Sequence, residues 1–157
     1  TIDSLWESSM DLIDPNMPFD IWDDSWRIYS RNESLPPQFL SDQSSVQNSL
    51  VCEGSVIDGT VDFSIVSYGC TIKKGADVRD SILMPGTVVE EGATIQYSII
   101  GESAVIKAGA KVGQRPENVE DKDKWGISVV APGVTVGSGA VIAAKDMVYN
   151  DVKGGDE

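Results

Sequence analysis

Residues 64–106 read SIVSYGCTIKKGADVRDSILMPGTVVEEGATIQYSIIGESAVI, and this stretch repeats itself at a fixed interval. The triplet Ser64-Ile65-Val66 returns as Ser81-Ile82-Leu83 and again as Ser98-Ile99-Ile100, 17 residues later each time. Within one repeat the aliphatic positions advance by 6, 6 and 5 residues, through Val66, Ile72, Val78 and Leu83. Agreement at so many positions in three copies identifies a structural repeat, which must be interpreted before any other pattern.

The repeat resumes late in the chain after an interruption. Ser128-Val129-Val130 mirrors Ser81-Ile82-Leu83 at an offset of 47, which exceeds two repeats by 13 residues. The extra residues correspond to about 114–126, a polar segment with one proline, which we expect to form a surface excursion. Upstream, Asn48-Ser49-Leu50-Val51 opens a shorter repeat, 15 residues before Ser64-Ile65-Val66.

A step of six residues accommodates one short strand and one turn, and three such steps return the chain above its starting point. The sequence therefore predicts an all-β fold, a single-stranded parallel β-helix of hexapeptide repeats from about Val46 to Val148, with coils about 4.8 Å apart. An antiparallel sandwich is disfavoured, because its strands recur at 8–12 residues with varied turns. Three inward columns are predicted: Val66/Leu83/Ile100/Val130, Ile72/Val89/Ile106/Val136 and Val78/Ile95/Val112/Ile142. Glycines are predicted at corners with positive φ: Gly69, Gly75, Gly86, Gly92, Gly109, Gly133 and Gly139.

Residues 1–45 lack the repeat and form a predicted N-terminal arm. Apolar residues in Ser4–Ile13 follow a helical stripe that Asp14-Pro15 ends. Trp26–Tyr29 is compatible with a short strand, and Leu35–Phe39 with an extended connector. Three of the four tryptophans lie in this arm, and we expect them to pack it against the end of the β-helix or against another domain, since an open β-helix end must be covered. A ligand-stacking platform is the alternative.

Charge, hydropathy and cysteine content each disfavour some partners and cellular locations. The net charge of −13 disfavours nucleic acid and anionic membranes as partners. We detect no signal peptide and no apolar run long enough to span a bilayer, so we expect a cytoplasmic protein. Cys52 and Cys70 lack metal or disulfide spacing and are interpreted as buried or half-buried thiols of a reducing compartment. Because Thr1 opens directly into Ile2-Asp3-Ser4, we expect a fragment of a longer protein.

The chain contains no histidine. Hexapeptide acyltransferases use a histidine base and γ-type carbonic anhydrases hold zinc with histidines, so neither mechanism is available. Adjacent acidic pairs such as Glu90-Glu91 and Asp23-Asp24 are interpreted as solvated rather than as general acid–base dyads. Gly137-Ser138-Gly139 is interpreted as a repeat corner rather than a phosphate loop, since no helix is expected to follow it. We therefore predict no catalytic, cofactor-binding or metal-binding residues in this chain.

Several segments together resemble one enzyme family. Residues 1–12, TIDSLWESSMDL, resemble the segment that ends the catalytic domain of bacterial ADP-glucose pyrophosphorylases (glucose-1-phosphate adenylyltransferases). Residues 26–32, WRIYSRN, and 35–40, LPPQFL, look like the linker of that family. Residues 48–51, NSLV, and 80–87, DSILMPGT, look like its β-helix coils. The resemblance spans nearly the whole chain, and the Pro-Pro-Gln linker is more specific than the repeats.

The resemblance implies that the parent enzyme transfers AMP from ATP to glucose 1-phosphate, which yields ADP-glucose and pyrophosphate for glycogen synthesis. It implies a Mg²⁺ requirement, a homo- or hetero-tetramer and a left-handed β-helix that serves subunit contacts and allosteric control. On this basis residues 1–45 are the arm and linker from a missing catalytic domain, and residues 46–157 are the β-helix domain. The nucleotide loop and acidic metal ligands of the family would lie in the missing domain, so this fragment alone is expected to be inactive.

Enteric members of the family bind a sugar-bisphosphate activator partly through arginines of the late coils, which this chain lacks at the corresponding stretches. Our hypothesis is that Arg115, Lys122 and Lys124 help to bind an anionic effector; the alternative is a solvated loop whose lysines pair with neighbouring acids. Other identities also remain open: the tail of another sugar-phosphate nucleotidyltransferase, such as a mannose-1-phosphate guanylyltransferase, the tail of a catalytically degenerate regulatory subunit, or a non-enzymatic β-helix scaffold.

Overall fold

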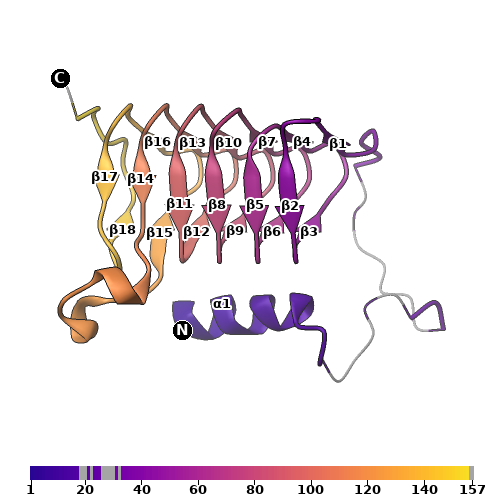
Figure 1. Cartoon of the computed structure of the whole chain (residues 1–157), viewed down its shortest axis with the longest axis horizontal. Coiled ribbons are helices and arrows are strands. Elements are labelled where there is room, and N and C mark those ends of the chain that lie inside the picture. Colours follow the sequence, from indigo (N-terminus) through magenta and orange to yellow (C-terminus); the bar gives the residue numbers. More distant parts are fainter. Residues whose placement is uncertain (18–20, 22, 26–30, 32, 156–157) are drawn as a thin grey trace.

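The computed structural model describes residues 1–17, 21, 23–25, 31 and 33–155, in which three parallel sheets form the sides of a triangular solenoid (Figure 1). Sheet A contains β1 (Phe39–Leu40), β4 (Val56–Ile57), β7 (Thr71–Ile72), β10 (Val88–Val89), β13 (Val105–Ile106) and β16 (Thr135–Val136). Sheet B contains β2 (Ser45–Gln47), β5 (Thr60–Asp62), β8 (Asp77–Arg79), β11 (Thr94–Gln96), β14 (Lys111–Val112) and β17 (Val141–Ile142). Sheet C contains β3 (Leu50–Val51), β6 (Ile65–Val66), β9 (Ile82–Leu83), β12 (Ser98–Ile100), β15 (Ser128–Val130) and β18 (Met147–Val148).

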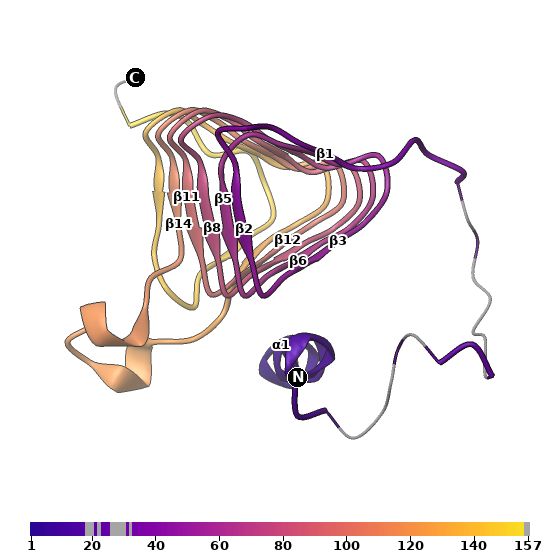
Figure 2. The same cartoon turned by 45° about the vertical axis from the view of Figure 1, so that its right-hand side comes forward.

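The chain visits the sheets in the fixed order A, B, C, so each strand pairs with the strand three elements later. Figure 2 looks towards the N-terminal coils, where the path runs anticlockwise as it recedes, which is a left-handed coil. The register is the one that the 17-residue repeat predicts, for example Ile72 beside Val89 and Val78 beside Ile95. The predicted parallel β-helix of hexapeptide repeats is confirmed.

The three predicted columns form the core of the solenoid. All twelve of their side chains are buried, and Ile142, in the last coil, is the most exposed of them at 5%. A buried aliphatic side chain of this size stabilises the fold by roughly 1.5–3 kcal/mol before conformational entropy is subtracted. Because neighbouring coils bury these side chains, the stability of each coil depends on the coils on either side of it.

The seven predicted corner glycines all adopt positive φ, between 66° and 72°. The corner between sheets B and C behaves differently, because it uses larger residues in the left-handed region. Asn48, Phe63, Asp80 and Tyr97 stand there in successive coils with φ between 43° and 49°, followed by Gly113. Such a conformation is uncommon outside glycine and asparagine, so this corner is strained at Phe63, Asp80 and Tyr97. The 17-residue repeat did not predict these left-handed residues.

A ladder of buried serine hydroxyls follows the strained corner. The backbone N–H of Ser81 donates to the hydroxyl of Ser64 over 3.2 Å, and the N–H of Ser98 donates to the hydroxyl of Ser81 over 3.2 Å. Each hydroxyl in turn donates to the carbonyl two residues earlier; the Ser81 hydroxyl reaches the carbonyl of Arg79 at 2.6 Å. The ladder therefore satisfies polar groups that the tight corner buries.

The solenoid begins before residue 46, where the sequence suggested the boundary. Strand β1 pairs with β4, and β2 starts at Ser45 and pairs with β5. The Leu35–Phe39 connector leads straight into this coil, and the N–H of Gly54 donates to the carbonyl of Pro36 over 2.6 Å. The repeat was aligned on its Ser-aliphatic-aliphatic triplets, and β1 precedes the first of them, Ser49-Leu50-Val51, which is why β1 was missed.

Helix α1 (Ile2–Met10) and the 3₁₀ turn η1 (Asp11–Ile13) confirm the predicted helical start of the arm. The helix lies along the outside of sheet C, parallel to the solenoid axis, and does not cover an end (Figures 1 and 2). Met10 and Trp6 pack there with the outward-facing Ile82 and Ile99. The expected packing of tryptophans on the end of the β-helix is therefore wrong for Trp6. The predicted strand at residues 26–29 and the other two arm tryptophans, Trp22 and Trp26, lie outside the described residues.

The predicted excursion at about 114–126 leaves the solenoid between β14 and β15. It contains two 3₁₀ turns, η2 (Pro116–Asn118) and η3 (Lys122–Lys124). The interruption does not disturb the ladder, because Ser128 pairs with Ser98 and Val130 with Ile100. In the described part of the chain, no helix is both long and apolar enough to cross a bilayer.

The serine ladder yields the first testable prediction. Ser81→Ala removes the acceptor of the buried Ser98 N–H, and an unsatisfied buried donor of this kind costs about 1–3 kcal/mol. We expect the free energy of unfolding, measured with urea, to fall by that amount. Ser138→Ala, on an exposed corner, is the matched control and should change little. Equal unfolding midpoints for the two variants would refute the structural role of the ladder.

Candidate functional site

The three predicted effector contacts lie in the excursion loop, residues 114–126, and differ in exposure. Arg115 is half-buried at the base of the loop, whereas Lys122 and Lys124 are exposed in η3. The ammonium of Lys124 lies 3.4 Å from the carboxylate of Asp121, as the solvated-loop alternative expected. The loop carries three basic and four acidic side chains, so it has no excess of positive charge to attract an anion.

Lys124 lines a shallow pocket of about 590 Å³ between the excursion loop and the last coil. Lys145, which no sequence pattern indicated, lines the same pocket from the last coil. Its ammonium donates to the carbonyl of Asp123 over 3.0 Å. Asp123 and Asp146 also line the pocket, so its two cations face two carboxylates. A mixed lining of this kind can orient a zwitterionic or polar ligand but does not by itself select an anion.

Aromatic packing attaches the excursion loop to the corner between sheets B and C. The ring of Trp125 meets the ring of Tyr97 edge-on, with centroids 5.3 Å apart and an interplanar angle of 75°. The indole N–H of Trp125 donates to the carbonyl of Gln114 over 2.8 Å, which ties the two ends of the loop together. An edge-to-face pair is a favourable aromatic geometry, worth about 0.5–1.5 kcal/mol beyond the area that it buries.

Helix α1 docks on the same corner. The Trp6 ring lies 5.7 Å from the Tyr97 ring, centroid to centroid, and the indole N–H of Trp6 donates to the carbonyl of Asp80 over 2.8 Å. Asp80 and Tyr97 occupy equivalent left-handed positions in consecutive coils. The strained backbone thus presents a carbonyl and a ring outward, where the helix and the loop meet them.

Charge and burial change the acidity of both corner residues. Burial raises the pKa of the Asp80 carboxyl, and the carboxylate of Asp62 adds to this rise, while the guanidinium of Arg115 partly offsets it. Burial also raises the pKa of the Tyr97 phenol, with further contributions from Asp80 and Glu117. Arg115 therefore acts on the corner residues rather than together with the two lysines.

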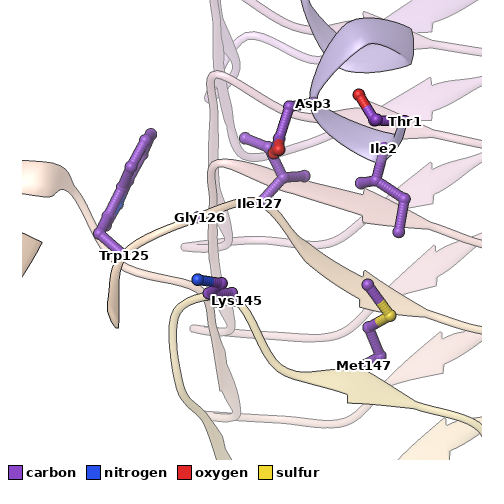
Figure 3. A pocket seen from close by; sticks show the side chains of 8 residues that line it. All are labelled: Thr1, Ile2, Asp3, Trp125, Gly126, Ile127, Lys145 and Met147. Atoms are coloured by element: carbon purple, nitrogen blue, oxygen red, sulfur yellow. The ribbon is translucent and has the colours of Figure 1, made fainter. Parts of the chain in front are cut away.

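A second pocket, of about 380 Å³, opens between helix α1 and the return of the excursion loop (Figure 3). Ile2, Trp125, Ile127 and Met147 provide its apolar walls, and Lys145 stands at its edge. The pocket combines three separate segments of the chain: the first turn of α1, the end of the loop and the last coil. Its shape depends on all three being in position.

Other reactive groups do not assemble into a centre. Within the described residues, no three potential metal ligands of the His, Cys, Asp or Glu type come together. Burial raises the pKa of the Cys70 thiol to about 11, and burial also raises that of Cys52. Thiols with raised pKa values are poor nucleophiles at neutral pH, which agrees with their interpretation as buried or half-buried thiols.

The acidity of Asp80 gives a prediction about pH. Because the folded protein holds this proton more tightly than the unfolded chain, the contribution of Asp80 to stability is present below its ordinary pKa of 3.8 and is lost as the pH rises through the raised value. Asp80→Asn should therefore become more stable relative to the unmodified chain as the pH rises from about 3 to 7. Asparagine also tolerates the positive φ, but that benefit does not vary with pH.

Urea midpoints at several pH values measure this difference. Glu91→Gln, on an exposed corner of the solenoid, controls for the general loss of one negative charge from an acidic protein. A difference between Asp80→Asn and the unmodified chain that stays constant across the pH range would contradict the prediction.

Comparison with known proteins finds one matching family and several relatives that share one name. Residues 36–136 match the family described as GlmU-like, C-terminal hexapeptide. The glucose-1-phosphate adenylyltransferase of Geobacillus stearothermophilus is 51% identical over 79 residues, which are 50% of this chain and 20% of that protein. The proteins of the same name from Bacillus mycoides (strain KBAB4) and Bacillus thuringiensis (strain Al Hakam) are 42% identical over 85 residues, 54% of this chain and 23% of each relative. The chain thus spans less than a quarter of the length of these relatives.

Proposed function

The chain belongs to the family of GlmU-like C-terminal hexapeptide domains, and from this membership we propose that it is the C-terminal regulatory and oligomerisation domain of a glucose-1-phosphate adenylyltransferase. The parent enzyme would transfer AMP from ATP to glucose 1-phosphate and release pyrophosphate. The observation that carries this proposal is the 51% identity to an adenylyltransferase of that name over half of the chain.

The structure favours a regulatory or structural role for this domain over a catalytic one. We expect ATP and Mg²⁺ to bind in the rest of the parent protein; among the described residues, no three His, Cys, Asp or Glu side chains come together. The whole chain has no histidine, and the Cys70 thiol has a pKa of about 11. What the chain offers instead is a rigid stack with a helix and a loop attached to one corner.

Assembly is the second part of the proposal. At the C-terminal end of the solenoid, β17 and β18 lie at the edges of sheets B and C, with Val141 and Met147 exposed at 64% and 47%. Exposed apolar edge strands are usually covered in the functional state. These edges favour an oligomeric parent protein, and the family resemblance leads us to propose a homo- or hetero-tetramer in the cytoplasm.

Activity assays of the full-length parent protein test the proposed function. With Mg²⁺, ATP and glucose 1-phosphate it should form ADP-glucose, whereas the 157-residue chain alone should form none. GTP with mannose 1-phosphate serves as the competing substrate pair. A clear preference for that second pair would replace the proposal with a guanylyltransferase. An inactive parent that stimulates a separate catalytic subunit would instead identify a degenerate regulatory subunit.

The hypothesis that Arg115, Lys122 and Lys124 contact an anionic effector is tested in the same full-length enzyme. Replacing all three with alanine should raise the concentration of a phosphorylated activator that gives half-maximal stimulation at least about fivefold, because charge-assisted hydrogen bonds are lost. The control replaces three exposed lysines elsewhere on the solenoid, Lys73, Lys74 and Lys111. An activator response that both triple variants leave intact would dispose of the hypothesis.

A further inference from the structure

We propose that Asp80 and Tyr97 couple helix α1 to the excursion loop, so that displacing either element from the corner loosens the other. This coupling is a property of the chain itself. It does not require that the parent protein be an adenylyltransferase or that the loop bind an effector.

Tyr97 contacts both elements at once. Its ring is 5.7 Å from that of Trp6 in helix α1 and 5.3 Å from that of Trp125 in the loop, centroid to centroid. The first pair is tilted by 33° and the second is edge-on at 75°, so the one ring contacts the two tryptophans in different geometries. A rotation of Tyr97 that improves one contact must therefore change the other.

Asp80 provides a second, polar connection between the same two elements. Its carbonyl accepts the indole N–H of Trp6, while its carboxylate lies within the electrostatic influence of Arg115 and Glu117 from the loop. The same corner residue, held at a φ of 49°, thus carries both the carbonyl that binds Trp6 and the carboxylate that the loop charges act on. A displacement of this corner backbone by the helix would therefore also move the carboxylate relative to the charges of the loop.

The apolar contacts join helix and loop in a single cluster. Met10, Ile82, Ile99 and Ile127 form its buried centre, and Trp6, Tyr97 and Trp125 pack around them. The pocket of Figure 3 has walls from the start of α1 and from the end of the loop. Removing one wall exposes apolar surface of the other, which links the two docking equilibria through burial.

The remaining attachment of the loop is local. Backbone N–H groups of Asn118, Val119, Lys124 and Trp125 donate to carbonyls within the loop itself. The last coil adds two contacts through Lys145, whose N–H donates to the carbonyl of Gly126 and whose ammonium donates to that of Asp123. These contacts hold the shape of the loop but do not involve α1, so the connection between helix and loop passes through the corner residues and the apolar cluster around them.

Hydrogen exchange of the 157-residue chain tests the coupling in both directions. In Trp6→Ala, exchange of the Val119 and Trp125 amides should accelerate by about 3- to 10-fold, the range expected when contacting residues are coupled. In Trp125→Ala, exchange of the amides of α1 should accelerate by a similar factor, because linkage between two sites is reciprocal. Leu5→Ala, which truncates an apolar side chain on the exposed side of α1, is the matched control.

Two further measurements separate coupling from general destabilisation. The Lys73 amide, which donates to the carbonyl of Val89 in the solenoid, should keep its exchange rate in every variant. Tyr97→Asn places at this corner the residue that already occupies it in the first coil, Asn48, and it should abolish the effect of Trp6→Ala on the loop. Trp6→Phe, which keeps an aromatic ring but loses the donor to Asp80, apportions the coupling between stacking and hydrogen bonding.

The proposal is overturned if Trp6→Ala leaves the loop amides within twofold of their original rates while α1 exchanges faster. It is also overturned if the loop responds equally to Trp6→Ala with tyrosine or asparagine at position 97. A uniform acceleration that includes Lys73 would show that the variant loosens the whole solenoid and that the corner has no specific role.

Discussion

Parallel pairing between successive coils is the interaction on which the rest of this structure depends. It fixes the distance between coils, aligns the aliphatic columns and repeats every corner at the same place along the axis. Because a corner is repeated, the same left-handed conformation recurs one coil later with a different residue, and the neighbours on both sides stabilise it. The serine hydroxyls bridge consecutive coils at the most strained corner, where Asn48, Phe63, Asp80 and Tyr97 adopt the left-handed conformation.

The inward half of the fold could be predicted from the sequence because its period is regular. Val66, Leu83 and Ile100 stand in one column in the structure as they do in the alignment. The packing of the outward-facing side chains could not be predicted from the sequence. The isoleucines Ile82 and Ile99 follow the same period, but a repeat does not say which side of the triangle a helix covers. Residues 39–45 were not assigned to the solenoid because they precede Ser49-Leu50-Val51, the first triplet on which the repeat was aligned.

The candidate site shows the same division between local and distant information. Arg115, Lys122 and Lys124 are close in sequence, and their charges suggested a common role; in the structure Arg115 is half-buried, where its charge also acts on Asp80, and the lysines are exposed. Tyr97 and Lys145 are separated widely from the loop in sequence and meet it only through the fold. Their importance follows from the coil that carries them, which no local motif encodes.

The excursion between β14 and β15 has a consequence for how such proteins diversify. Ser98 and Ser128 lie side by side although far more chain separates them than separates Ser81 from Ser98. Coil stacking therefore depends on where the strands lie in space and not on how many residues connect them. An ancestral solenoid could accept an insertion between β14 and β15 without a change in its axis. A chain with this stack can therefore vary here in length and composition while the paired coils stay unchanged.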